Sequence, residues 1–245
     1  MGRLCQEANM NSQLLPDVLE DARAAAGVRA INRHHGLAEA AYEAIFAQLM
    51  ALRIAPGSRI TVDNLARELN VSQTPIREAL GRLEGEGLVI KTHLIGYSAA
   101  RQISRRRFDE LYELRLLLEP DAAAKAARQM DERKIAELRE LAGVMSRRQG
   151  GDERVRYSAF ARLDATFHDR ILEFAGNDLI RQTLAHQHTH FHIFRLMFHS
   201  RVTEEALDEH EALLAAFEAG DGKAASQAMR EHIEHSRDRL LPAFE

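Results

Sequence analysis

The sequence predicts a mainly α-helical protein, with an N-terminal domain of three helices and one hairpin followed by an antiparallel bundle of six helices. Three observations support this. Apolar residues recur with helical spacing from Leu37 to Leu52. Two short strand-like segments flank a loop within residues 88–99. After residue 100 the pattern is helical throughout, with short turns that favour antiparallel neighbours.

Length and composition restrict the class of protein. The 245 residues fit one large domain or two ordinary ones, and 45% apolar with 29% charged residues is typical of a soluble globular chain. A single cysteine, Cys5, excludes a disulfide framework and a cysteine-cluster metal site. The sequence has no run of 18 apolar residues and no secretion signal. We therefore expect a cytoplasmic protein without a membrane partner.

Charge is distributed unevenly along the chain, although the net charge is only −4. Residues 36–107 contain ten Lys/Arg and seven Asp/Glu, a balance of +3. Residues 108–245 contain 19 Lys/Arg and 26 Asp/Glu, a balance of −7. A mildly basic segment beside an acidic one suits a nucleic-acid-binding head on a body that does not itself contact phosphate.

The N-terminal half divides into a tail and a small domain. Residues 1–35 show no sustained periodicity and predict a mobile tail with a short helix at 16–26. The domain is expected at 36–103. Its first helix ends before Pro56-Gly57, and a short extended piece follows at 58–60.

Two short helices separated by a tight turn come next. Thr61 is the predicted N-cap of a helix to Leu69, and Ser72 that of a helix to Glu86, with Pro75 in its first turn. Segments 88–91 and 96–99 predict a hairpin. The order helix, helix, helix, hairpin is that of a winged helix-turn-helix.

The second short helix has the features of a recognition helix. Backbone N–H groups at its start favour phosphate, and the side chains of Ser72, Gln73 and Thr74 can bond phosphate or base edges. Arg77, one turn in, can bond guanine O6 and N7. A single arginine could equally pair with Glu78 on a solvated surface, but the cap, the proline, the arginines and the hairpin together predict DNA binding. The predicted contacts are Arg67, Ser72, Gln73, Thr74, Arg77, Arg82, His93 and Gly96.

Residues 56–88, PGSRITVDNLARELNVSQTPIREALGRLEGEGL, resemble the GntR superfamily of bacterial transcription regulators. The shared pattern is Pro-Gly, Leu-Ala, Val-Ser-x-Thr-Pro-x-Arg-Glu-Ala-Leu and Leu-Glu-x-x-Gly-Leu. The resemblance implies that Arg67, Arg77 and Arg82 contact DNA. Relatives often have Gly-Arg-Gly near the wing tip, whereas this chain has His93-Leu94-Ile95-Gly96, so it keeps the turn glycine and lacks the wing-tip arginine.

The C-terminal part, 104–245, is predicted to be entirely helical. Ser104 is the expected cap of the first helix, and glycines break the chain at Gly150-Gly151 and at Gly176. The six helices are predicted at about 105–129, 131–148, 153–175, 178–199, 203–219 and 222–241.

Four residues in this part form a candidate metal site. Asp164 and His168 are four residues apart and therefore share a helix face. His210 and His232 lie on the predicted fifth and sixth helices. If those helices enclose one cavity with the third, three imidazoles and a carboxylate converge, which suits Zn, Ni, Mn or Fe. From spacing alone, an Asp-x-x-x-His pair is more often a surface pair or a satisfied core histidine.

Residues 106–245 are similar to the effector-binding FCD domain of the FadR-type subgroup. The similarity lies in ELYELRLLLEP (110–120), DATFHDRILEFAGN (164–177), DEHEALLAAFEAGD (208–221) and AMREHI (228–233). It implies a divalent metal held by Asp164, His168, His210 and His232, and a domain that also dimerises. Six helices resemble the shorter, VanR-like branch.

Arg115 lies where that family has an arginine facing the cavity. The resemblance implies that it clamps the carboxylate of a small organic acid opposite the metal. The alternative is an ion pair with Glu119, four residues on.

The run HQHTHFHIF also invites a metal interpretation. On one continuous helix, residues two apart point in nearly opposite directions, so His186 and His190 share one face and His188 and His192 another. These residues are compatible with lining the cavity or with adventitious metal, and we assign none of them as a ligand.

These observations predict a ligand-responsive transcription regulator, a repressor, that binds double-stranded operator DNA as a homodimer, because one recognition helix covers only a half-site. A small organic acid at the metal would control operator affinity. The first alternative is a metal-dependent enzyme, which a fused DNA-binding head and the lack of a spare general base argue against. The second is a direct metal sensor. No catalytic residue is predicted.

Overall fold

The structure, a computed structural model, describes residues 34–147, 153–197 and 200–245. The predicted tail and its helix at 16–26 lie outside the described residues. The mainly α-helical class is confirmed, and residues Ala38–Glu245 form one unit. Among the described helices, none is both long enough and apolar enough to cross a membrane.

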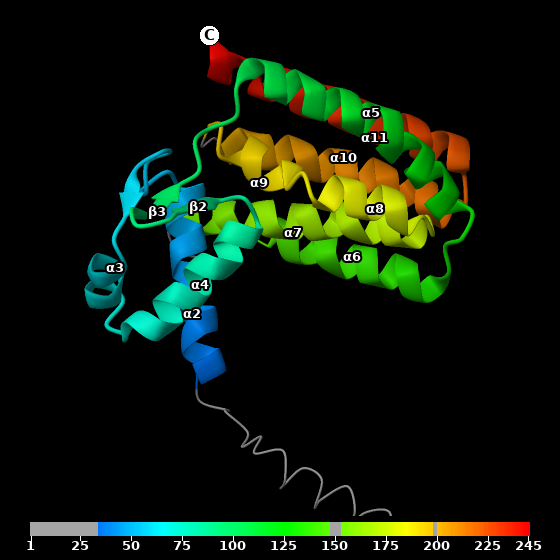
Figure 1. Ribbon diagram of the computed structural model, residues 1–245. Helices are drawn as coiled ribbons and strands as arrows, with labels where there is room; N and C mark the ends of the chain where they lie inside the picture. The colour runs from blue at the N-terminus through cyan, green and yellow to red at the C-terminus, as the bar shows by residue number, and fades with distance from the viewer. Residues whose placement is uncertain (1–33, 148–152, 198–199) are drawn as a thin grey trace, which may run out of the picture. The chain divides into compact units, whose positions relative to one another are not determined.

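The N-terminal elements follow the predicted order of a winged helix-turn-helix (Figure 1). They are α2 (His34–Met50), β1 (Arg59–Ile60), α3 (Val62–Glu68), α4 (Gln73–Gly85), β2 (Val89–Thr92) and β3 (Gly96–Ala99). The strands form an antiparallel sheet in the order β1-β3-β2. Ile45 of α2 and Ile76 and Leu80 of α4 are fully buried, so the helices share one apolar core.

Side-chain capping differs from the prediction at two helices. Thr61 and Ser72 occupy the N-cap positions of α3 and α4 with extended backbone, but neither side chain makes a cap hydrogen bond. At α4 the reason is local: Pro75 stands at the third helical position and has no N–H to donate to the Ser72 hydroxyl. The predicted cap at Ser104 is confirmed, because its hydroxyl accepts from the backbone N–H of Arg107.

The C-terminal part contains α5 (Arg105–Ala127), α6 (Glu132–Ser146), α7 (Glu153–Phe174), α8 (Asp178–Ala185), α9 (Thr189–Phe194), α10 (Ser200–Glu218) and α11 (Gly222–Leu240), followed by a 3₁₀ turn at Leu241–Phe244. The predicted helix at 178–199 is wrong as a single element, because the chain turns at His188, which has φ 46°. The described residues thus hold seven bundle helices instead of six. The count therefore does not single out the shorter branch.

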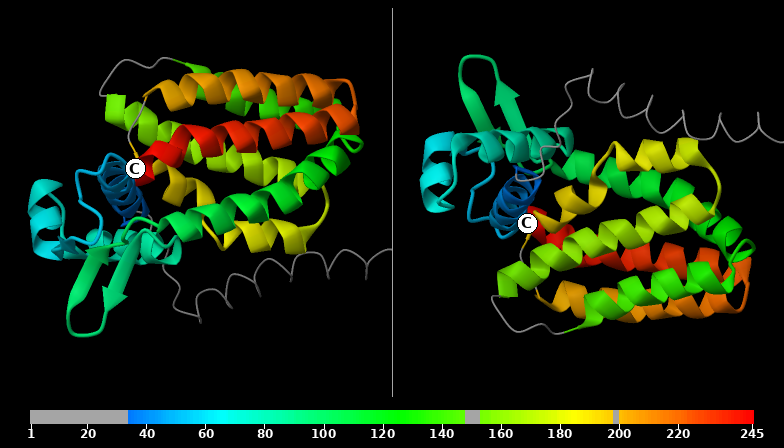
Figure 2. Two further views of the ribbon diagram at one scale, coloured as in Figure 1. Left: turned by 90° about the horizontal axis from the view of Figure 1, so that it is seen from above. Right: turned by 90° about the horizontal axis from the view of Figure 1, so that it is seen from below.

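Five long helices enclose the interior of this part. In Figures 1 and 2, α11 lies alongside α5 and α10, α6 lies alongside α7, and contacts of α10 with α6 and of α5 with α7 close the ring. Helices α8 and α9 pack against α7. Polar residues on the inner faces of these helices are removed from water, so they must be satisfied by each other or by a bound group.

Gly222, the first residue of α11, is expected to tolerate no side chain. A Cβ at this position would lie 2.8 Å from the carbonyl oxygen of Ala124 in α5, a backbone atom that cannot swing away. Overpacking of this kind costs about 1–3 kcal/mol. Gly222→Ala is thus expected to lower the free energy of unfolding by that amount in urea titrations. Gly143→Ala in α6, where the added Cβ meets no atom within 4 Å, is the control and should be neutral or stabilising.

Candidate functional site

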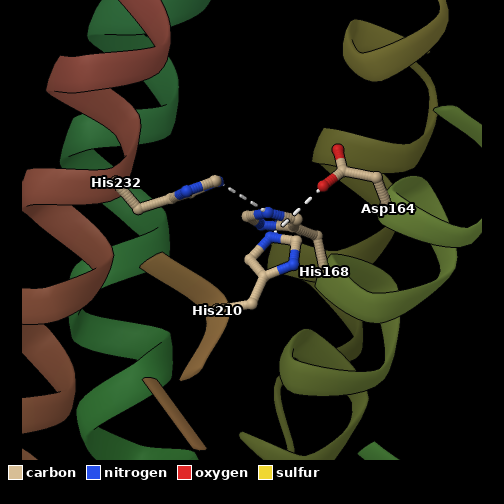
Figure 3. Close-up of side chains that lie close together, drawn as sticks. All are labelled: Asp164, His168, His210 and His232. Carbon is tan, nitrogen blue, oxygen red and sulfur yellow. Dashed lines mark hydrogen bonds and ion pairs between the residues drawn. The ribbon is translucent and has the colours of Figure 1, made fainter. Parts of the chain in front are cut away.

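The four predicted metal ligands meet inside the helical part (Figure 3). Asp164 and His168 come from α7, His210 from α10 and His232 from α11. One possible ligand atom from each lies within 4.8 Å of the others, and all four side chains are buried. The i, i+4 spacing therefore places Asp164 and His168 on one face of α7, as predicted. Helices α10 and α11 contribute the other two candidate ligands.

Two of the histidines are oriented by carboxylates. The Nδ1 atom of His168 lies 2.8 Å from Glu119, and the Nδ1 atom of His232 lies 2.8 Å from Glu209. An ionised carboxylate only accepts hydrogen bonds, so each Nδ1 carries a proton and each Nε2 is left to face the other ring. The two Nε2 atoms are 3.1 Å apart. The two Nε2 lone pairs therefore face each other at close range, an arrangement that a metal ion bound to both nitrogens would relieve.

His210 adds two ring nitrogens that no described protein group satisfies. It is 0% exposed, and within the described part of the chain neither of its ring nitrogens has a hydrogen-bond partner. Its Nε2 lies 3.2 Å from Oδ1 of Asp164, yet that oxygen also lacks a partner with hydrogen-bond geometry. A buried polar atom left unpaired costs about 1–3 kcal/mol. Three imidazoles and a carboxylate with free lone pairs fit Zn, Ni, Mn or Fe.

The carboxylates of the site are ionised. Burial raises the pKa of Asp164, but the neighbouring imidazoles of His210 and His168 outweigh it and hold the pKa below its usual range. Burial likewise raises the pKa of Glu119, and the Arg115 guanidinium with His168 lowers it well below normal. For Glu209, Arg239 and His232 outweigh burial and bring the pKa to about 2. Negative charge is thus available for a cation.

Arg115 is 1% exposed and bonded to Glu119 through Nε at 2.6 Å and Nη2 at 3.3 Å. The ion pair considered as the alternative is therefore present. Because Glu119 also contacts His168, the pair extends into the candidate metal site. The role of Arg115 toward an organic acid stays a prediction.

His190 lies beside the site, although the sequence pattern did not distinguish it from the other histidines of the His186–His192 run. Its Nε2 lies 3.7 Å from Oδ2 of Asp164, and its ring centroid lies 4.6 Å from that of His168. The predicted pairing of His186 with His190 is wrong, because the turn at His188 separates them. His186 is exposed and contacts the carbonyl of Gln182, while only 15% of the His190 side chain is exposed.

A pocket of about 170 Å³ lies next to the cluster, between α5, α7, α8 and α9. Its polar wall includes Glu119, His168, Thr189 and His190, and Leu172, Leu184 and Phe191 contribute apolar surface. The cluster is therefore next to a space large enough for a small molecule.

The predicted DNA-contacting side chains are all exposed. Ser72, Gln73, Thr74 and Arg77 share the N-terminal end of α4, where Arg77 donates to Gln73 at 3.3 Å. Gln73 in turn donates to Asp63 of α3 at 2.6 Å, which fixes the two helices relative to each other.

Two of the predicted arginines are engaged by protein groups. Arg67 donates to Asn64 on its own helix. Arg82 pairs with Glu39, and its guanidinium lies 3.9 Å from the centroid of the Tyr42 ring on α2. His93 and Gly96 lie in the wing loop and at the start of β3, where Gly96 has φ 105°.

Comparison with known proteins identifies both parts. Residues 37–96 match "Bacterial regulatory proteins, gntR family" and residues 110–235 match "FCD domain". The chain is 28% identical to the uncharacterized HTH-type transcriptional regulator YdhC of Bacillus subtilis, over 78% of this chain and 84% of that protein. It is 28% identical to the probable D-xylose utilization operon transcriptional repressor of Paenarthrobacter nicotinovorans, over 74% and 78%.

Among solved structures, McbR/YncC of E. coli superposes with a TM-score of 0.62 at 22% identity, covering 85% of this chain and 99% of that one, which shows a common fold. The family matches include the recognition helix and all four candidate metal ligands. This chain is a transcriptional regulator of the bacterial gntR family that carries an FCD domain.

Proposed function

We propose that the protein is a repressor whose affinity for operator DNA is controlled by a small organic acid bound at a metal ion in the FCD domain. The observation that supports this most is the buried set of Asp164, His168, His210 and His232. Its ligand atoms converge, and several of them have no hydrogen-bond partner among the described residues. A bound divalent ion would supply open positions that attract a carboxylate oxygen.

The protein's own residues prepare that site. Glu119 and Glu209 fix the protonated nitrogens of His168 and His232, which leaves both Nε2 atoms for the ion. Arg115 uses Nε and Nη2 on Glu119, and a guanidinium has five N–H donors. We infer that the remaining N–H donors of Arg115 hold the side of the acid's carboxylate that faces away from the ion.

Helix α9 supports communication between the acid site and the DNA-binding elements. His190 of α9 lies beside Asp164, and the next residue, Phe191, packs edge-on against Phe46 of α2 with ring centroids 5.2 Å apart. Arg195, which follows α9, donates to the carbonyl of Ala100 at 2.8 Å. A small shift of α9 on acid binding would therefore move contacts made directly with α2 and with the segment after β3.

DNA reading is assigned to the exposed end of α4, with Arg77 contacting base edges. A homodimer would place two such helices on a two-fold operator. An acid that binds more tightly to one arrangement of the two DNA-binding domains shifts the population toward that arrangement. Operator affinity then changes by an amount set by the difference between the acid's affinities for the two arrangements.

The test uses an operator fragment selected from random duplexes by the purified protein. Fluorescence anisotropy measures operator affinity with Zn or Mn present, with and without a panel of organic acids. We expect at least one acid to weaken operator binding about 5- to 150-fold, the usual range for allosteric coupling. The effect should vanish after metal removal by EDTA and dialysis.

The other interpretations give different results in the same experiment. If metal alone changes operator affinity and no acid adds to it, the protein is a metal sensor. If an acid is consumed with turnover in the presence of metal, the site is catalytic. If neither metal nor any acid alters operator affinity, the proposed regulation is wrong.

A further inference from the structure

We propose that the pocket between α5, α7, α8 and α9 binds a monocarboxylate with a compact apolar body, and that Thr189 and His190 contact its acid group. This inference rests on the proposed function, since it names the class of effector and two residues that select it. It adds the first two residues of α9 to a site so far built from α5, α7, α10 and α11.

One buried polar atom on each of these two side chains lacks a hydrogen-bond partner among the described residues. Thr189 is 4% exposed, and among the described residues its hydroxyl has no hydrogen-bond partner. The Nε2 atom of His190 is likewise buried and has no hydrogen-bond partner within that part of the chain, since Oδ2 of Asp164 is 3.7 Å away. Native proteins leave few buried polar groups unsatisfied. Two in succession on the wall of one pocket indicate a ligand that accepts hydrogen bonds.

The other helical threonines of this region show the contrast. Thr166 donates to the carbonyl of Arg162 at 3.0 Å, and Thr183 donates to that of Leu179 at 2.7 Å. This is the usual way for a threonine to satisfy its hydroxyl within a helix. Thr189 begins a helix after the turn at His188, and its hydroxyl is left for another acceptor.

The remaining walls of the pocket are largely apolar. Leu172, Leu184 and Phe191 can pack against an apolar body, and an apolar body gains most by leaving water. Two carboxylates, Glu119 and Asp169, also line the pocket. Their charges are engaged by Arg115 and Arg181, and among the described residues no Lys or Arg lines the pocket to receive a second anionic group. A dicarboxylate is therefore disfavoured relative to a monocarboxylate. The acid group is expected at the polar wall formed by Thr189, His190 and the metal site.

The size of the pocket limits the body of the acid. The pocket measures about 170 Å³. A cavity of roughly 150 Å³ in another protein holds benzene. A body the size of one ring or of a short branched chain therefore fits, which makes benzoate and 3-methylbutanoate suitable probes.

The experiment measures binding to the full-length, Zn-loaded protein by thermal shift and isothermal titration calorimetry. The probes are benzoate, 3-methylbutanoate, isophthalate with its second carboxylate, and uncharged benzyl alcohol. At least one monocarboxylate is expected to bind and raise Tm. Isophthalate and benzyl alcohol should bind at least tenfold more weakly than benzoate. Equal or tighter binding of either, or no binding of both monocarboxylates, would overturn the assigned ligand class.

Variants test the two residues. Thr189→Val keeps the shape and removes the hydroxyl, and His190→Leu removes the ring. Each is expected to weaken monocarboxylate binding at least tenfold, while Tm without ligand stays equal or rises, because an unpaired buried group is removed. A purely structural role would instead lower the ligand-free Tm. Thr183→Val and His186→Leu on the exposed side of the same segment are the matched controls and should bind as wild type.

Failure of this inference can be told apart from failure of the proposed function. If both variants bind monocarboxylates as tightly as wild type, the assignment of Thr189 and His190 is wrong, while acid-controlled operator affinity can still hold. A second outcome is that monocarboxylates bind, the variants weaken that binding, and yet no acid changes operator affinity. In that case the assigned pocket is correct and the proposed regulation is wrong.

Discussion

Replacing His210 by alanine is expected to remove bound metal and the response to acids while leaving operator binding by the unliganded protein near wild type. His210 is fully buried and contributes one of four converging ligands, and both of its nitrogens lack partners within the described residues. Loss of a hydrogen-bond partner to a ligand already costs 10–100-fold in metal affinity, so loss of a ligand itself should cost roughly 100-fold or more. Metal content after dialysis, measured by plasma mass spectrometry, checks this.

The control variant replaces a histidine that lies near the candidate metal site but is not one of its four ligands. His235 contacts Glu209 at 3.1 Å but is mostly exposed and lies outside the converging set, so His235→Ala should retain metal. Because His210→Ala also leaves a cavity, His210→Leu is made in parallel to preserve volume. Both His210 variants should lose metal. If either folded variant keeps full metal content, His210 is not a ligand.

Half of the candidate metal site could be predicted from local sequence. Asp164 and His168 need only a continuous helix to share a face, and α7 supplies it. Placing His210 and His232 opposite them required the packing of α10 and α11, which spacing does not encode. The resemblance to FCD domains supplied that step.

The groups that orient the ligands could not be predicted in the same way. Glu119 was visible only as a helical partner of Arg115, four residues away, and its contact with His168 spans 49 positions of sequence. Glu209 adjoins His210 in sequence yet bonds His232 of the neighbouring helix. Such pairs depend on how two helices pack. The local sequence around Glu119 or Glu209 does not distinguish either residue from a glutamate that only faces solvent.

His190 was missed for a different reason. Residues 178–197 contain no glycine or proline, so local propensity predicts an unbroken helix. Helix α8 ends at Ala185, and the left-handed backbone at His188 then starts α9 in a new direction, which changes the face of every later residue. A turn at a non-glycine residue in this conformation is disfavoured locally, and tertiary packing must compensate for it.

Arg77→Ala is expected to abolish sequence-specific operator binding with no loss of stability. Arg77 is exposed on the first turns of α4, and its hydrogen bond to Gln73 at 3.3 Å is long and on the surface. A bidentate arginine–guanine pair contributes about 1–3 kcal/mol of discrimination in each half-site. A two-fold operator loses two such pairs, so specific affinity should approach that for random DNA. Anisotropy with selected and scrambled duplexes measures the ratio.

Salt dependence then distinguishes base reading from phosphate contact. If Arg77 reads a base, the variant loses the difference between the selected and scrambled duplexes, and the slope of log affinity against log salt changes little. If it contacts only phosphate, both duplexes weaken together and the slope falls. Arg106→Ala in α5, a highly exposed arginine paired with Glu110, is the control and should bind like wild type. An Arg77→Ala protein that still prefers the selected duplex as strongly as wild type would remove α4 from its role as the recognition helix.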